Sequence, residues 1–242
     1  MDHGRGKTAP SQERLERAHR ILDAAAELLQ RWGYNKSNID DIAKQAGVGK
    51  GTIYLHWRTR EDLFAALVCR EQVELAKDFE RRIADGPENA RLGTIIKHTV
   101  LALMKRPLLK ALAVGDINIW GKLLEREQGN AAFVKKIEGF KWYLEFLQER
   151  HLIRQDLSLT EQLNILAAVT MGFFVVAPVA PEEYRLSDEE MGDLIAKAIS
   201  GALEPNRPIS TDELSEVWEA FMEYAARVSA ALGERLQVEL GG

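Results

Sequence analysis

The 242-residue sequence predicts an all-α protein. Three observations favour this class. Apolar residues recur at the three- and four-residue spacing of an amphipathic helix along nearly the whole chain, and no stretch alternates convincingly between apolar and polar residues as a half-buried strand would. Glycines and prolines fall between the periodic stretches, where helices are expected to end. The composition, 46% apolar and 29% charged, is typical of a globular protein with a buried core.

Four helices are predicted in the first third of the chain, after a polar, flexible arm at residues 1–12. They cover residues 13–32, 39–46, 50–57 and 60–84. Ser37 or Asn38 can cap the second of these helices. Thr59, with Asp62 three residues later, forms a start resembling a capping box for the fourth. These local signals support the predicted starts of the second and fourth helices.

A second group of helices is predicted after the break at Gly86-Pro87. We expect them at residues 89–105, 107–113, 117–127, 130–151, 159–177, 188–203 and 211–235. The longest largely apolar run, residues 165–180, contains Gly172 and Pro178 and falls short of the roughly 20 residues that a membrane span needs. We therefore interpret it as a buried helix and expect no membrane partner.

Charge is distributed unevenly along the chain. Residues 1–82 carry 15 Lys and Arg against 13 Asp and Glu, a net charge of +2, whereas residues 83–242 carry 17 against 24, a net charge of −7. A total of −5 argues against a protein that binds nucleic acid regardless of sequence, which would be basic throughout. If the chain binds nucleic acid, the N-terminal part is expected to do so.

Cysteine content and the first residues indicate the compartment. Cys69 is the only cysteine, so no disulfide framework and no cysteine-rich zinc site can form within one chain. The first residues, MDHGRGKTAPSQE, lack the apolar segment of a signal peptide. We expect a cytoplasmic protein without metal or cofactor.

Between Ile42 and Arg60 the chain runs for 19 residues without an Asp or Glu. This segment, IAKQAGVGKGTIYLHWRTR, contains two short helical patterns separated at Gly47–Gly49, which is the layout of a helix-turn-helix. Its charged and titratable residues are Lys44, Lys50, His56, Arg58 and Arg60. A locally cationic pair of helices suits binding to the phosphates of DNA.

The residues of the predicted helix 50–57 divide between two sides. At 100° per residue, Ile53 and Trp57 share one side and should face the core. The residues expected to face the major groove, which is wide enough to admit an α-helix, are Gly51, Thr52, Leu55 and His56. Leu55 would be an unusual surface residue, but it suits contact with a thymine methyl group.

The segment GKGTIYLHWRTREDLF, preceded by IDDIAKQAGV, resembles the N-terminal domain of the TetR (TetR/AcrR) family of bacterial transcriptional regulators over about residues 15–75. The resemblance implies a DNA-binding domain at 13–75, with the helix-turn-helix motif at about 38–57, and a helical effector-binding and dimerisation domain at 76–242. The DNA contacts that we expect on this basis are Lys50, Gly51, Thr52, Tyr54, Leu55, His56, Arg60 at a phosphate, and Ser37.

Two positions depart from the family pattern. Trp57 stands where a Phe is usual, and Asp40 stands where a basic residue is common. The second departure puts in doubt a phosphate contact from the predicted helix 39–46. Tyr54 lies beside the inward side of its helix, so its ring has a packing role as an alternative to a phosphate contact by its hydroxyl.

A dimer is expected because one reading helix contacts few base pairs, and two half-sites about 34 Å apart supply the specificity. The helices predicted at 159–177 and 188–203 are candidates for the dimer surface, and in the family the penultimate helices form a four-helix bundle with those of the second copy. The expected interface residues are Ile165, Leu166, Val169, Phe173 and Val176. The alternative is that this run belongs to the core of one chain.

An apolar effector cavity with a few polar groups is also expected in the second group of helices. Its candidate lining residues are His98, Leu101, Met104, Asn118, Trp120, Trp142, Phe146, Thr170, Met171 and Phe174. Taken singly, each of these residues is more readily explained as a core residue than as a ligand contact. The last predicted helix, 211–235, is amphipathic, extends past the usual family end and should pack on the effector-binding domain or on a second copy.

An all-α enzyme is a rival hypothesis, less favoured than a regulator that needs no ligand. A di-iron bundle needs two Glu-x-x-His motifs and two further carboxylates, and the chain has only Glu16–His19. The motifs Gly-x-Ser-x-Gly, the phosphate loop and His-Glu-x-x-His do not occur in the sequence. The favoured hypothesis is a homodimeric repressor that a small, largely apolar ligand releases from its operator in double-stranded DNA. A ligand-independent regulator or activator is the alternative.

Overall fold

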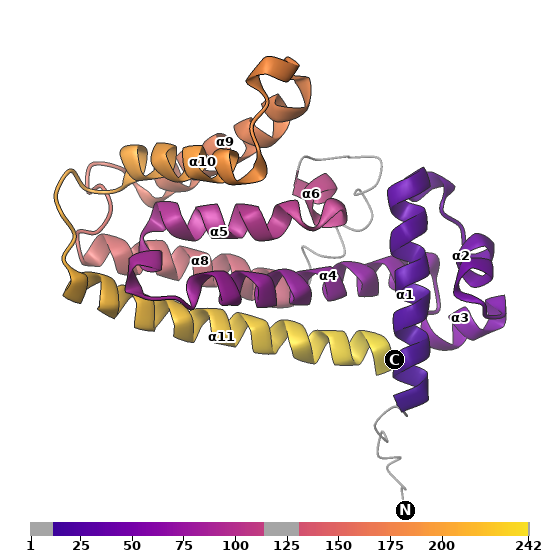
Figure 1. Cartoon of the computed structure of the whole chain (residues 1–242). Helices are drawn as coiled ribbons and strands as arrows, with labels where there is room; N and C mark the ends of the chain where they lie inside the picture. Colours follow the sequence, from indigo (N-terminus) through magenta and orange to yellow (C-terminus); the bar gives the residue numbers. More distant parts are fainter. Residues whose placement is uncertain (1–11, 114–130, 242) are drawn as a thin grey trace, which may run out of the picture.

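The computed structural model describes residues 12–113 and 131–241 (Figure 1). Over these residues the chain forms helices and no β-strand, so the predicted all-α class is confirmed. The predicted arm lies outside the described residues, except Gln12, which begins the first helix. The helix predicted at 117–127 also lies outside them.

Helices α1 (Gln12–Trp32), α2 (Ile39–Ala46) and α3 (Lys50–His56) form the N-terminal unit, with a short 3-10 turn, η1 (Tyr34–Lys36), between the first two. Asn38, rather than Ser37, caps α2: its side chain accepts a hydrogen bond from the Asp41 N–H at 2.9 Å. Helix α2 ends at Gly47, whose φ of 65° is the left-handed conformation that favours glycine.

Helix α4 (Arg60–Ile83) begins at the predicted capping box, in which Thr59 and Asp62 exchange hydrogen bonds between side chain and backbone. The helix runs from the N-terminal unit into the rest of the molecule (Figure 1). Its first half contributes Leu63 and Leu67 to a first hydrophobic core, shared with α1, α2 and α3, and its last residue, Ile83, belongs to a second core. The predicted domain boundary, between residues 75 and 76, falls inside this continuous helix.

Most of the helices that follow border the second core. The helices are η2 (Pro87–Ala90), α5 (Leu92–Met104), α6 (Pro107–Ala113), α8 (Ala131–Glu149), α9 (Leu159–Val176), η3 (Ala177–Val179), η4 (Glu182–Tyr184) and α10 (Asp188–Leu203). Leu108 and Leu109, of α6, belong to the first core instead. Helices α5 and α10 lie side by side (Figure 1). They approach closely at Gly93, where a Cβ would lie 2.6 Å from the Ala196 carbonyl oxygen.

Helix α9 corrects one prediction. We expected its apolar run to be buried, but within this chain only Gln162 and Phe174 of α9 are buried, and Val175 and Val176 are about 60% exposed. The helix is long and apolar enough, by length and composition, to cross a membrane. The reason for the error is that apolarity predicts burial but not whether the covering surface comes from the same chain.

Helix α11 (Thr211–Gly241) is longer than the predicted 211–235. It packs along α4 and against η2 and α8, which confirms the expected packing on the second group of helices. Its C-terminal end also reaches α1 (Figure 1), and Leu232, Leu236 and Leu240 belong to the first core. The sequence did not predict this contact with the N-terminal unit.

Candidate nucleic-acid interface

Helix α3 is held by two residues that face the first core. Ile53 is fully buried and Trp57, which ends the helix, is 3% exposed. Both were predicted to face inward. The backbone N–H of Trp57 donates a hydrogen bond to the Ile53 carbonyl at 2.9 Å, so the two anchors are also joined through the backbone. A helix of seven residues is too short to be stable alone, so these contacts set its orientation.

The opposite side of α3 faces outward. Lys50, Gly51, Tyr54 and Leu55 are exposed, and Thr52 is half-buried. Leu55 is the extreme case, because 75% of this apolar side chain is exposed at the centre of the outward side. Tyr54 is 45% exposed, so its hydroxyl can reach a ligand beyond the protein surface. The helix thus presents a cation, hydroxyl groups and an apolar side chain together, the residue types that contact phosphates and base edges.

His56 was predicted to face outward, and this prediction is wrong. The side chain is only 7% exposed, and its Nδ1 is buried without a hydrogen-bond partner. His56 lies three residues after Ile53, which places it only about 60° from that inward anchor around the helix. Burial, reinforced by the charges of Arg14 and Arg17 on α1, lowers the pKa of His56, so the ring is neutral at neutral pH.

Ser37 and Arg60 are also placed differently from their predicted role in DNA contact. Ser37 is fully buried, and its hydroxyl donates to the Gly33 carbonyl at 2.8 Å. The Arg60 guanidinium donates to the carbonyls of Ser37, at 2.9 Å, and Tyr34, and it lies 4.0 Å from the centre of the Tyr34 ring. Both residues join η1 to the start of α4. Carbonyls near the end of a 3-10 turn need donors, and Arg60 supplies them.

Lys50 is paired with the residue that departs from the family pattern. Its Nζ lies 2.9 Å from Oδ2 of Asp40, on α2. The hydrogen bond with this carboxylate raises the pKa of Lys50, which therefore remains charged. Both side chains are solvent-exposed, so the pair contributes little stability. In this state Asp40 partly neutralises the cation at the start of α3.

The N-terminal end of α1 is a part of this surface that the sequence did not indicate. The Arg14 guanidinium donates to the Leu55 carbonyl, at the end of α3, with an N–O distance of 3.5 Å. Arg17, one turn later, is paired with the exposed Glu13 at 2.8 Å. Arg14 lies 41 positions before Leu55, a separation at which no local pattern indicates a contact.

The predicted effector residues do not gather around one described pocket. Leu101 is buried where α5 meets Gly192 of α10, whereas the Trp142 ring lies 6.2 Å from that of Tyr224 on α11 and is 37% exposed. Met104, Phe146, Met171 and Phe174 contribute to the second core. Asn118 and Trp120 lie outside the described residues. The apolar residues of the predicted effector set thus pack at different contacts between helices.

Two polar members of the predicted effector set have unpaired buried atoms. Among the described residues, Nδ1 of His98 on α5 and Oγ1 of Thr170 on α9 are buried without a hydrogen-bond partner. Burial, together with the neighbouring charges of Lys97 and Arg82, lowers the pKa of His98. Its imidazole is therefore neutral near pH 7 and can accept or donate a hydrogen bond.

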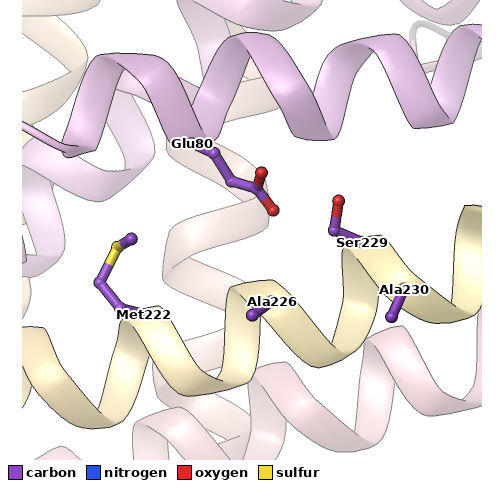
Figure 2. A pocket seen from close by; sticks show the side chains of 5 residues that line it. All are labelled: Glu80, Met222, Ala226, Ser229 and Ala230. Carbon is purple, nitrogen blue, oxygen red and sulfur yellow. The ribbon is translucent and has the colours of Figure 1, made fainter.

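A pocket of about 400 Å³ lies elsewhere, between α4 and α11 (Figure 2). The side chains that line it are Glu80, Met222, Ala226, Ser229 and Ala230. None of these residues belongs to the predicted effector set. The pocket is an open groove along two packed helices, since small residues on α11 leave space opposite Glu80.

The predicted dimer residues lie on one helix with incomplete cover. Ile165, Leu166, Val169 and Phe173 of α9 are half-buried against the second core, and Val176 is 59% exposed. Further large apolar side chains are exposed just after this helix, at Val179 and Tyr184. The apolar surface therefore continues from α9 into the connection to α10.

Comparisons with known proteins agree with this geometry. Residues 21–67 match the profile of the family described as "Bacterial regulatory proteins, tetR family". The regulator AcrR of Shigella flexneri is 39% identical over 186 residues, which span 74% of this chain and 86% of AcrR. A fatty acid metabolism regulator of Bacillus subtilis is 36% identical over 129 residues, which span 52% of this chain and 62% of that protein. The chain spans less than two thirds of the length of several such curated relatives.

Comparison with solved structures shows which fold the chain shares. NalD of Pseudomonas aeruginosa, described as the secondary repressor of a multidrug efflux pump, superimposes with a TM-score of 0.60 at 18% identity and covers 81% of this chain and 100% of NalD. The similarity to NalD shows a common fold. The segment matched at residues 21–67 and the extent of the AcrR similarity show that this chain belongs to the TetR family of bacterial regulatory proteins.

Proposed function

We propose that this chain is a sequence-specific transcriptional regulator that reads double-stranded DNA with α3. The observation that carries this proposal is the division of the helix into a buried and an exposed side. Ile53 and Trp57 hold α3 on the core, and Thr52, Tyr54 and Leu55 are left at its outward side. An exposed Leu beside hydroxyl groups has a clear use in the major groove, where a thymine methyl and phosphates lie close together.

The proposed active form is a homodimer built through α9 and α10. Helix α9 leaves much of its apolar surface uncovered in the single chain, with Val175 and Val176 about 60% exposed. A second copy would cover this surface and bring a second α3 to the next half-site. A membrane is the alternative cover for α9. The dimer is favoured because α9 begins at an exposed capping box, Ser158 with Glu161, and carries a half-buried polar residue, Thr170, in its apolar run.

The proposed effector is a small, largely apolar molecule with at least one hydrogen-bonding group. His98 and Thr170 support it, since an unpaired buried polar atom costs about 1–3 kcal/mol and a ligand could supply the partner. Effector binding would release the repressor from DNA if the ligand binds more tightly to a dimer whose two α3 helices do not match the half-site spacing. We propose no catalytic role and a cytoplasmic location.

Selection of duplexes from random DNA by the pure protein tests the central proposal. The expected result is a palindromic sequence whose half-sites are centred about 34 Å, one helical turn, apart. Light scattering on the same preparation should give the mass of two chains. Recovery of no enriched sequence would reject DNA reading, and a monomer bound to a single half-site would reject the dimer.

A thermal-shift screen of apolar and cationic compounds tests the effector. A stabilising compound should lose affinity for the variant His98→Ala, because the variant removes the polar atom that we assign to the ligand. If no compound stabilises the protein while operator binding remains strong, the ligand-independent regulator becomes the better hypothesis.

A further inference from the structure

Helix α11 belongs to both hydrophobic cores. Val217 and Phe221, in its first half, lie in the second core, whereas Leu232, Leu236 and Leu240 lie in the first core with Ile53 and Trp57. At 1.5 Å per residue, its 31 residues extend over roughly 45 Å. Figure 1 shows α11 running beside α4 and ending at α1. One helix thus connects the helices around the second core to the unit that holds α3.

A hydrogen bond from a tryptophan indole N–H is found near each end of α11. Near the start of α11, Nε1 of Trp218 donates to the Ile83 carbonyl, at the end of α4, over 3.2 Å. Near its other end, the Glu239 carbonyl accepts a hydrogen bond of 3.0 Å from Nε1 of Trp57. Trp57 is the C-cap residue of α3, so this second bond joins the last turns of α11 to the end of the reading helix.

We propose that the last turns of α11, residues 232–241, are a positioning element for α3. Helix α3 has only seven residues, and its orientation depends on the surface beneath it. Leu236 and Leu240 belong to the same hydrophobic core as Ile53 and Trp57, and the Glu239 carbonyl accepts the hydrogen bond from the Trp57 ring. This inference rests on the proposed reading of DNA by α3. It adds that DNA reading also requires the end of α11, which lies outside the segment matched by the family profile.

The hydrogen bond to Glu239 depends on the Trp at position 57. A Phe at this position could fill the same core, but it has no N–H to donate to Glu239. Two of the features that depart from the family pattern, Trp57 and the extended C-terminal helix, therefore meet at one hydrogen bond. Residues 57 and 239 are 182 positions apart, so only the folded chain brings them together.

A matched pair of variants tests the proposal. Trp57→Phe and Trp218→Phe each remove an indole donor from one end of α11 and keep an aromatic ring. Operator affinity should fall about fivefold for Trp57→Phe, as expected for the loss of one neutral hydrogen bond, and stay within about twofold for Trp218→Phe. Equal affinities for both variants, or parental affinity for Trp57→Phe, would overturn the proposal.

Removal of the leucines tests the apolar part of the contact. In the double variant Leu236→Ala/Leu240→Ala, operator affinity should fall at least tenfold, whereas Val238→Ala, which alters an exposed side chain on the same turns, should keep the parental value. Affinities are measured well below the unfolding temperature of each variant, where a loss of global stability alone leaves the folded protein's affinity unchanged. Parental affinity in the folded double variant contradicts positioning by these leucines.

Cys69 supplies a reporter in the parent protein, independent of whether the double variant folds. Its thiol is buried in the first core, with Sγ 3.9 Å from the Leu232 carbonyl of α11, so a thiol reagent reaches it when α11 leaves the core. Operator DNA should slow the reaction at saturation, because it favours the docked helix. An unchanged rate would overturn the proposal. Failure of the parent to bind any duplex would instead reject the proposed function.

Discussion

Helices α3 and α9 both expose apolar side chains, but they do so in different ways. Helix α3 exposes Tyr54 and Leu55 on a short helix whose other side is firmly buried through Ile53 and Trp57. Helix α9 is 18 residues long, and only Gln162 and Phe174 are buried. The contrast indicates that contacts within one chain are enough to hold α3 in place, whereas much of the apolar surface of α9 has no cover within the chain.

The difference separates two aspects of the proposed DNA reading. The orientation of α3 depends on contacts within the chain, from the first core and from the end of α11. In the proposed dimer, the distance between the two copies of α3 would depend on how α9 pairs with the second chain. Variants on α9 should therefore alter assembly, and variants on α3 should alter affinity without altering assembly.

The largest effect is expected from a charge on α9. Val176→Glu places a carboxylate on a side chain that is 59% exposed in the single chain but covered in the proposed dimer. Burying an unpaired charge costs several kcal/mol, so operator affinity should fall about 100-fold or more, with a monomer in light scattering. Val238→Glu, at an exposed site on α11, is the control. A Val176→Glu variant that remains dimeric at micromolar concentration would place the interface elsewhere.

A smaller loss is expected from the outward side of α3. Thr52→Ala and Tyr54→Phe each remove one hydroxyl, and a hydrogen bond to a charged phosphate contributes about 1.5–3 kcal/mol, so each should weaken operator binding about tenfold or more. Fluorescence anisotropy measures the affinity, and light scattering should still give the parental dimer. Parental affinity in both variants would reject this side of α3 as the reading surface.

A gain in affinity is expected from Asp40→Asn. The variant removes the carboxylate that pairs with Lys50 at 2.9 Å, so the ammonium group becomes available to a phosphate. Affinity should rise a few fold, and the slope of log affinity against log salt should become steeper by about 0.9, the value for one additional phosphate contact. Asp212→Asn removes the same charge from the exposed start of α11 and serves as control. An unchanged salt slope would mean that Lys50 does not contact phosphate.

The smallest effect concerns pH and the buried His56. Its pKa in the folded protein is lowered, so the unfolded chain binds a proton first as the pH falls through about 6.5. The contribution of the neutral ring to stability is present above that pH and is lost toward pH 5. His56→Gln should flatten the dependence of the unfolding free energy on pH in this range, measured by denaturant titration. His98, whose pKa is also lowered, should retain part of the dependence.

Carboxylates act in a different pH range and do not obscure this test. Hydrogen bonds from Arg207 and Ser210 lower the pKa of Glu213 to about 2, and the unfolded Glu titrates near 4.3. Its contribution to stability is therefore lost only below about pH 4.5. An identical pH dependence for the parent and His56→Gln between pH 7 and 5 would contradict the role given to the buried ring.

Local sequence patterns predicted most helices to within a few residues. The capping box at Thr59 and Asp62 and the apolar spacing of Ile53 and Trp57 have the predicted geometry. His56 was misplaced because, in a helix this short, a residue three positions after an anchor can face either the core or solvent. The element that packs nearby determines whether such a residue is buried. Here α1 lies close enough for the Arg14 guanidinium to donate a hydrogen bond to the Leu55 carbonyl.

The order of residues alone predicted the helical class, most helix boundaries to within a few residues and the inward anchors of α3, because these depend on spacing and on caps a few residues away. The roles of Ser37 and Arg60, the extent of the uncovered surface of α9 and the contact of α11 with Trp57 depended on the folded chain. Each involves a surface or partner that spacing cannot specify: Arg60 bonds to carbonyls 23 and 26 positions earlier, and Trp57 to one 182 positions later. Apolar periodicity indicates that a helix face will be covered, and tertiary packing determines which element covers it.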